Sequence, residues 1–138
     1  MKQVSDIEQS HELGRLKNFP EPDMVIEYFW AVKNHPIHLM RDKNLLIKDE
    51  DVDYVPAWSL GKMIEGLPGS IEYCEKSCED DIPITYDLQI CPESDGKMAQ
   101  VKYVMYKGTK VLYKTESVNL ADALFEMIMK LDNLGWFK

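Results

Sequence analysis

Three aspartates stand at every second position in the stretch "KDEDVDY" and could bind a calcium ion. Asp49, Asp51 and Asp53 match positions one, three and five of an EF-hand loop. That loop also needs glycine at position six and glutamate at position twelve, where this chain has Tyr54 and Leu60. We therefore predict no metal here and interpret the aspartates as solvated charges ahead of a helix, where the helix dipole favours them.

The next stretch, "VPAWSLG", differs by one residue from the G-x-S-x-G turn that carries the nucleophile of α/β-hydrolases. That turn needs a strand before the serine, whereas Ser59 falls inside a helical pattern that begins at Pro56. The hydrolase fold also requires a much longer chain. An enzyme site around residues 49–59 is therefore the weakest function hypothesis, and it requires Tyr54 and Trp58 to line a concave pocket.

The cysteines Cys74, Cys78 and Cys91 are odd in number, which argues against a disulfide framework. The segment "CEKSC" could form a zinc site with Cys91 and a histidine, but no second pair of ligands follows the first. His35 and His38 stand far from it in the sequence. We interpret the cysteines as free or partly buried thiols, and we predict no metal and no cofactor. Glycine-rich phosphate loops are also missing from the sequence.

A lysine-rich stretch at residues 97–114 contains five lysines and no acid, with tyrosines interleaved. Its lysines could hold the phosphates of a single nucleic-acid strand while tyrosines stack on the bases. Alternatively, they line the solvent face of a hairpin and prevent edge-to-edge pairing. Because Tyr103 and Tyr113 alternate with lysines, we expect them on the core-facing side, where stacking on bases is prevented. The lysines considered for binding are Lys102, Lys110 and Lys114.

Composition predicts one globular domain over residues 1–138, with 45% hydrophobic and 29% charged residues. The net charge of −8 disfavours general nucleic-acid binding, which usually requires a basic domain. No apolar run is long enough to span a membrane. The N-terminal stretch "MKQVSDIEQS" lacks the apolar segment of a secretion signal, so we expect a cytoplasmic protein.

Apolar periodicity predicts an α+β fold, in which an antiparallel sheet of at least three strands packs with helices. The strands form a meander with a turn at Asp95-Gly96. The predicted strands cover about 82–91, 98–107 and 110–115, and the predicted helices cover about 5–13, 56–67 and 118–134. Residues 24–32 suit either a strand or a buried helix, and periodicity does not distinguish the two.

Each predicted helix has a start signal. Ser5 and Glu8 fit a capping box for the first helix, and Pro56 suits the first turn of the second. Ser117 or Asn119 can cap the third helix. The third helix also has an apolar stripe at helical spacing, formed by Leu120, Leu124, Met127, Ile128 and Leu131.

Four separated segments form an ordered set: "DIEQSHEL", "PDM", "VPAWSLGKMIEGLP" and "NLADALFEMIMKL". They resemble a family of small uncharacterised proteins encoded by gut Bacteroidales and by the phages and mobile elements of that group. In that family the patterns read PAWSLxxLLExLP and LxDAxxEMIxxL. The resemblance implies no known activity and no functional residue. Its mobile-element context implies a small accessory or interaction protein, such as a modulator of a host factor.

We therefore hypothesise a non-enzymatic interaction protein that binds a protein partner or itself. The lack of a catalytic constellation, the acidic composition and an apolar tail at Trp136-Phe137 favour this hypothesis, although the tail could equally fold back on the core. Tyr54 and Trp58 are further candidate contact residues. The alternative is a nucleic-acid binder that uses the lysine- and tyrosine-rich hairpin over residues 97–114.

Overall fold

The computed structural model describes residues 2–29, 39–42, 52–74, 83–105 and 110–137. Within these ranges the helices are α1 (Ile7–Gly14), α2 (Leu60–Gly66) and α3 (Leu120–Asn133). A three-stranded antiparallel sheet has the order β2-β1-β3 and contains β1 (Met24–Phe29), β2 (Leu39–Asp42) and β3 (Val52–Ala57). A four-stranded antiparallel sheet has the order β4-β5-β6-β7 and contains β4 (Ser70–Tyr73), β5 (Ile84–Cys91), β6 (Ala99–Met105) and β7 (Val111–Ser117).

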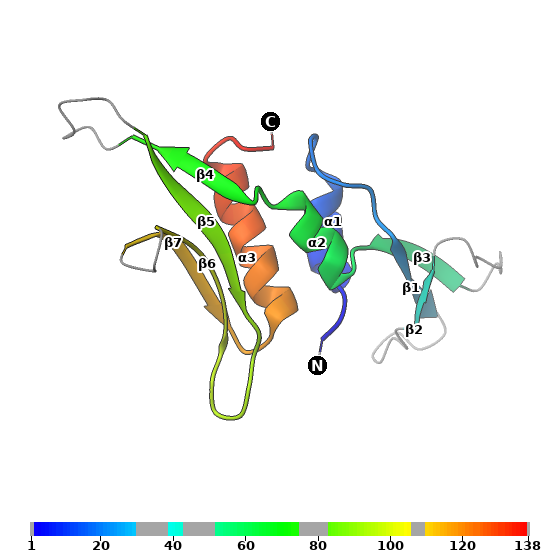
Figure 1. Ribbon diagram of the computed structural model, residues 1–138. Helices are drawn as coiled ribbons and strands as arrows, with labels where there is room; N and C mark the ends of the chain where they lie inside the picture. Colours follow the sequence, from blue (N-terminus) through cyan, green and yellow to red (C-terminus); the bar gives the residue numbers. More distant parts are fainter. Residues whose placement is uncertain (1, 30–38, 43–51, 75–82, 106–109, 138) are drawn as a thin grey trace.

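The protein is thus α+β, as predicted, with a four-stranded meander packed against α3. In Figure 1 the larger sheet, then α3, then α1 and α2, then the smaller sheet follow one another across the molecule. The three predicted meander strands are present as β5, β6 and β7. Gly96 adopts φ +73° in the β5–β6 turn, which confirms the turn expected at Asp95-Gly96.

Helix α3 follows the predicted pattern closely. Asn119 is its N-cap, and the Asn119 side chain accepts a hydrogen bond from the backbone N of Asp122 at 2.8 Å. Thr115 of β7 donates through Oγ1 to the carbonyl of Ala123 at 2.8 Å, which joins the sheet to the helix. All five residues of the predicted stripe are buried. The stripe therefore forms the centre of the core, as the periodicity indicated.

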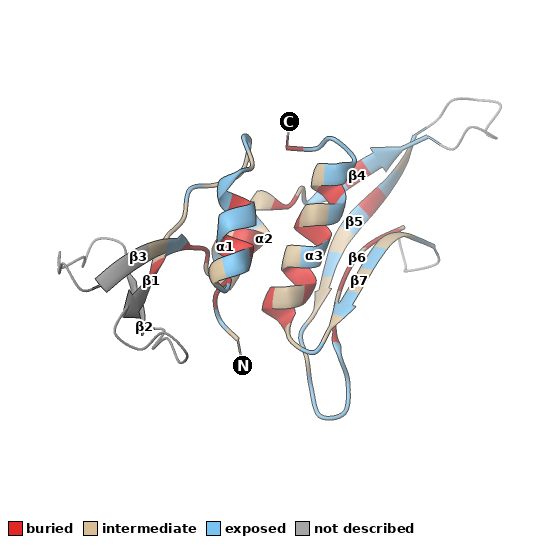
Figure 2. Cartoon of the chain, turned by 180° about the vertical axis from the view of Figure 1, so that it is seen from behind, coloured by how far each residue is buried: buried red, intermediate tan, exposed pale blue. Residues whose placement is uncertain are grey.

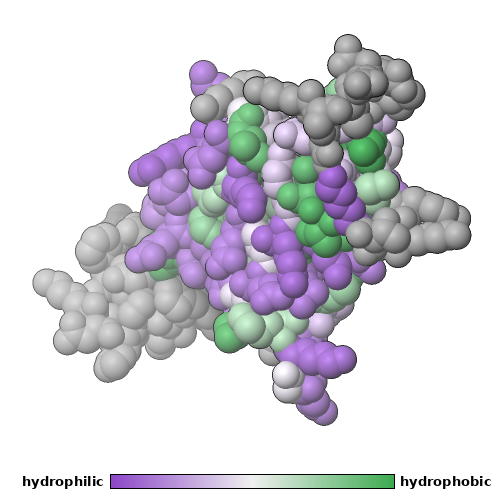
Figure 3. All heavy atoms as spheres, turned by 90° about the vertical axis from the view of Figure 1, so that its left-hand side faces the viewer, coloured by the Kyte–Doolittle hydropathy of each residue, from purple (hydrophilic) through white to green (hydrophobic). Residues whose placement is uncertain are grey.

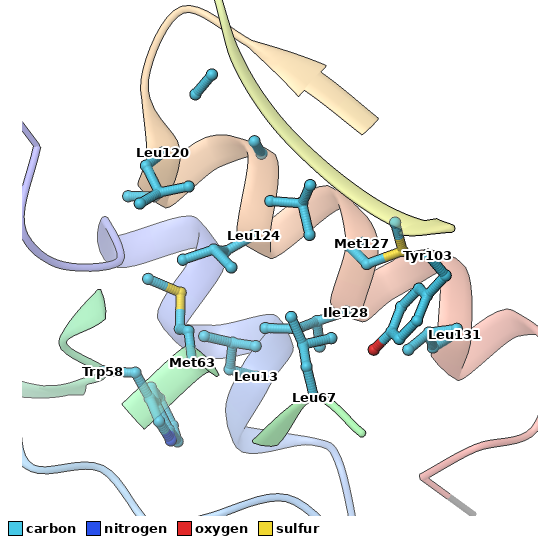
Figure 4. Close-up of a cluster of buried hydrophobic side chains, with 14 of the residues drawn as sticks. Leu13, Trp58, Met63, Leu67, Tyr103, Leu120, Leu124, Met127, Ile128 and Leu131 are labelled. Atoms are coloured by element: carbon cyan, nitrogen blue, oxygen red, sulfur yellow. The ribbon is translucent and has the colours of Figure 1, made fainter. Parts of the chain in front are cut away.

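The core lies on both sides of α3. Figure 4 shows Leu13, Leu67 and Ile128, from α1, the end of α2 and α3, pointing toward one another. On the sheet side, Tyr103 lies beside Leu131 in the same view. Because both faces of α3 are covered, the helix contributes more buried side chains than any other helix that the structure describes.

The N-cap of helix α1 is one residue later than predicted. Asp6 is the N-cap, and its capping box joins it to Gln9 instead of joining Ser5 to Glu8. The two patterns are one residue apart, and tertiary contacts select between them. The hydroxyl of Ser5 is buried, lies 2.8 Å from the Ser10 hydroxyl and accepts from the backbone N of Trp58 at 3.0 Å.

The predicted start of the second helix at Pro56 is wrong. Residues 56–57 belong to β3, where Pro56 pairs with Val25. Strand β3 is an edge strand, so a proline without an N–H can occupy it without removing a central ladder bond. Helix α2 begins only after Ser59, its N-cap. Residues 24–29 are a strand, which resolves the ambiguity in that part of the chain, and 30–32 lie outside the described residues.

Candidate functional site

The first candidate region is the junction between β3 and α2, where two segments of the ordered set meet. Asp23, from "PDM", accepts from the backbone N of Ser59 at 2.9 Å and from the Ser59 hydroxyl at 2.5 Å. The same hydroxyl accepts from the backbone N of Lys62 at 3.3 Å, as an N-cap does. These contacts join two chain segments and cap a helix, so the geometry of Ser59 is that of a structural serine.

Trp58 is a core residue. Its side chain is 4% exposed, and its indole Nε1 donates to the carbonyl of Pro20 at 2.7 Å. Figure 4 shows it beside Met63 at one end of the core. Tyr54 lies in β3, and its side chain falls outside the described residues, as do residues 49–51. The buried position of Trp58 removes one of the two aromatic walls that the enzyme hypothesis required.

Lys102 and Lys114 of the predicted hairpin lie on the outer face of the larger sheet. Lys102 pairs across the strands with Lys114, which is exposed. The ammonium of Lys114 lies 2.7 Å from Oε1 of Glu116, and this hydrogen bond lowers the pKa of Glu116. Figure 3 faces this side of the molecule and shows a mostly hydrophilic surface with smaller hydrophobic patches. Lys110 is exposed at the start of β7.

Tyr103 and Tyr113 of the hairpin face the core, as predicted. Tyr103 is fully buried and donates through its hydroxyl to the carbonyl of Pro68 at 2.7 Å. Burial raises the pKa of Tyr103 well above its ordinary value. Tyr113 is half-buried, and the ammonium of Lys130 lies 5.6 Å from its ring centroid. Neither ring is placed to stack on a base, which disfavours the nucleic-acid alternative.

The C-terminal tail divides into a buried and an exposed residue. Phe137 is buried and meets Phe19 edge-on, with ring centroids 5.4 Å apart. Its neighbour Trp136 remains 43% exposed. The tail therefore folds back on the core through Phe137, which also lines the hollow between α1 and α3, while Trp136 is the more exposed residue of the pair.

A groove lies between α1 and α3. Its first part has a volume of about 620 Å³ and lies at the N-terminal ends of both helices. A second part of about 460 Å³ lies at their C-terminal ends, and Glu12 lines both parts, so the two adjoin. Figure 2 shows α1 and α3 side by side at this face, with half-buried and exposed residues on both. We call the two parts together the α1–α3 groove.

The α1–α3 groove has an apolar floor and acidic walls. Phe125 and Met129, one helical turn apart on α3, are half-buried apolar residues that line it, and Leu16 joins them from the segment after α1. The acids that line it are Asp6, Glu8, Glu12, Asp122, Glu126 and Asp132. Arg15 and Lys17 lie in the second part, and His11 lies in the first. The groove is therefore amphipathic, and its negative charge is concentrated in the first part.

A polar network lies at the N-terminal end of the groove. Lys2 donates to Asp122 at 2.6 Å, and Gln9 of α1 donates to the same carboxylate oxygen at 2.7 Å. Asn119 donates to the other oxygen at 2.8 Å. Burial by itself would raise the pKa of Asp122, but the hydrogen bonds from Lys2, Gln9 and Asn119 together hold it below its ordinary value. The network fixes α1 beside α3 and so maintains the shape of the groove.

Sequence reasoning missed the groove, although one signal for it was present. Phe125 and Met129 stand four residues apart in α3, outside the predicted stripe of buried residues. Both residues pack against the edge of the core, and an apolar pair off the stripe also indicates a second contact surface. The acids of α1 carried no such signal, because their proximity to α3 depends on the tertiary fold.

The sequence predicts no metal site, and the structure shows the following for metal-binding groups and membrane-spanning helices. In the described ranges there is no group of three or more histidine, cysteine or acidic side chains that could hold a metal ion. Cys74 and Cys91 are free thiols, and Cys78, His35 and His38 lie outside the described residues. None of the helices that the structure describes is long and apolar enough to cross a membrane.

Comparison of the chain with protein-family models, with curated proteins and with solved structures gave no match in any of the three. The resemblance to the Bacteroidales family therefore stays a prediction based on the four segments. The structure joins these segments in pairs, because Asp23 of "PDM" accepts a hydrogen bond from Ser59 of "PAWSL", and Gln9 of "DIEQSHEL" donates one to Asp122 of "NLADALFEMIMKL".

Proposed function

We propose that this protein is a small non-enzymatic interaction protein that binds a protein partner in the α1–α3 groove. The observation that carries the proposal is the half-buried pair Phe125 and Met129 on the groove floor, bordered by acidic residues of both helices. Apolar side chains in a concave surface with a polar rim are typical of protein interfaces. A role as an accessory protein fits the small size and the lack of a recognised catalytic motif.

Substitution of one floor residue tests the proposal. Met129→Glu places a charge on the groove floor, and Met98→Glu makes the same change at an exposed position outside the groove. Both variants and the unaltered protein serve as bait in a host-cell lysate, with bound proteins identified by mass spectrometry. A stoichiometric protein that binds the unaltered chain and Met98→Glu but not Met129→Glu supports the proposal. A partner that Met129→Glu retains would contradict it.

Light scattering on the purified protein separates a partner from self-association. A monomer at micromolar concentration agrees with the groove being open to another protein. A dimer that Met129→Glu converts to a monomer would mean that the groove binds a second copy instead, and that result would replace the hetero-partner in our proposal.

A further inference from the structure

We infer that the partner segment of the α1–α3 groove is a cationic amphipathic helix, with its basic residues at the end that lies over the first part of the groove. This inference rests on the proposed function and adds the chemistry of the partner. It draws on three features: the acids that line the groove, the spacing of its apolar floor, and its length.

The negative charge of the groove favours a positively charged partner segment. Glu8 on α1 and Glu126 on α3 line the first part of the groove, and neither has an ion-pair partner among the residues that the structure describes. The remaining acids there are partly balanced, because Lys2 is shared between Asp6 and Asp122 and Arg15 pairs with Glu12. A Lys or Arg side chain lying between the two helices would find two unpaired carboxylates in reach, while an acidic segment would be repelled.

The floor sets the periodicity of the partner. Phe125 and Met129 are separated by four residues along α3, so their side chains lie about 6 Å apart along the helix axis. A partner helix has the same spacing between its own i and i+4 positions, so its row of side chains can pack against the ridge that Phe125 and Met129 form on α3. Two apolar residues of a partner helix at that spacing would meet Phe125 and Met129 in register.

The length of the groove sets the length of the partner segment. Its lining extends along α3 from Asp122 to Asp132, which is ten helical rises or about 15 Å. About three turns of a helix fill that length. The second part contains Arg15 and Lys17 besides Asp132, so its charge is mixed. The partner is therefore expected to carry its basic residues at one end only.

Selection from a random dodecapeptide library displayed on phage, with the intact protein as bait, tests the inference. We expect enriched peptides to carry Lys or Arg with apolar residues spaced three or four apart. Glu8→Gln combined with Glu126→Gln should weaken their binding, measured by fluorescence anisotropy at low salt, by about five- to tenfold, and less at high salt. Glu72→Gln with Asp87→Asn removes the same charge from exposed strand positions on the larger sheet and should leave binding unchanged.

The outcomes separate this inference from the proposed function. Enriched peptides that are acidic or uncharged, or that bind the Glu8→Gln, Glu126→Gln variant as tightly as the unaltered chain, would overturn the cationic partner. If those peptides still lost binding to the Met129→Glu variant, the groove would remain the proposed binding site. A selection that enriches no specific sequence would overturn the inference. Peptides whose binding is unchanged by the two glutamate substitutions and by Met129→Glu would overturn the inference and would also contradict binding in the groove. The two glutamates are exposed, so their variants are expected to fold normally.

Discussion

The ammonium of Lys2 lies 2.6 Å from a carboxylate oxygen of Asp122, although 120 positions of sequence separate the two residues. This contact joins the N-terminal segment to the first turn of α3, at the N-terminal end of the α1–α3 groove. Gln9 of α1 reaches the same oxygen. The orientation of α1 relative to α3 is therefore set partly by one carboxylate.

Asp122→Asn should lower the free energy of unfolding at neutral pH and should change how that free energy depends on pH. The folded-state pKa of Asp122 lies below its unfolded value of about 3.9, so its contribution is present above that value and is lost as the pH falls through the folded pKa. We expect a loss of about 1 kcal/mol at pH 7. Urea unfolding between pH 2 and 7 measures this, and an unchanged difference between the two proteins across that range would contradict it.

Two buried tyrosines should respond oppositely to loss of the hydroxyl. Tyr103 donates to the carbonyl of Pro68, whereas the hydroxyl of Tyr86 is buried without a hydrogen-bond partner among the described residues. Tyr103→Phe should therefore cost about 1 kcal/mol of unfolding free energy, because it leaves the Pro68 carbonyl unsatisfied. Tyr86→Phe should be neutral or stabilising. Urea unfolding compares them, and a larger loss for Tyr86→Phe would refute this assignment.

Asp23 and Ser59 should be energetically coupled. Ser59→Ala removes an N-cap and the partner of Asp23, for an expected cost of about 1–2 kcal/mol. In the double variant with Asp23→Ala, the combined loss should be smaller than the two single losses added together. A double-mutant cycle from thermal or urea unfolding measures the coupling. Simple additivity would show that the contact contributes nothing specific.

The two residues of the C-terminal tail should differ in their effect on stability. Phe137→Ala should cost about 3 kcal/mol, because the ring is buried and packs edge-on against Phe19. Trp136→Ala removes a partly exposed ring and should cost well under half as much. Thermal unfolding of both variants gives the comparison, and equal losses would mean that Trp136 is a second core anchor.

The lysines of the outer sheet face should not bind nucleic acid. Lys114 is paired with Glu116, and the nearby Tyr103 and Tyr113 face the core. A labelled single-stranded oligonucleotide should therefore show no salt-sensitive binding at about 50 mM salt. Binding that disappears on Lys102→Glu combined with Lys114→Glu would restore the nucleic-acid alternative.

Elements with a strong local pattern could be predicted from the sequence. The α3 stripe, the alternating strands β5 to β7 and the Asp95-Gly96 turn all depend on residues close together in the chain. The start of α2 could not be predicted in the same way. Its N-cap Ser59 is held by Asp23, 36 positions earlier, and Pro56 is tolerated in a strand only because β3 lies at a sheet edge.

The candidate site was predicted less well than the fold, for a physical reason. Trp58 and Phe137 suggested contact surfaces by residue type, but large aromatic rings are as useful in a core, and both are buried there. The groove depends on α1 lying beside α3, and that placement rests on contacts such as Gln9 with Asp122. Such long-range pairs carry no local sequence signal.

The most direct test of the central claim is to locate the surface on which a bound partner lies. Nuclear magnetic resonance spectra of the isotope-labelled protein, recorded with and without a captured partner or selected peptide, would map the contact surface residue by residue. We predict that the largest shift changes fall on Glu8, Glu12, Phe125 and Met129, while Lys102 and Lys114 on the outer sheet face stay unchanged. Changes confined to the outer sheet face, with the α1–α3 groove unaffected, would contradict the account.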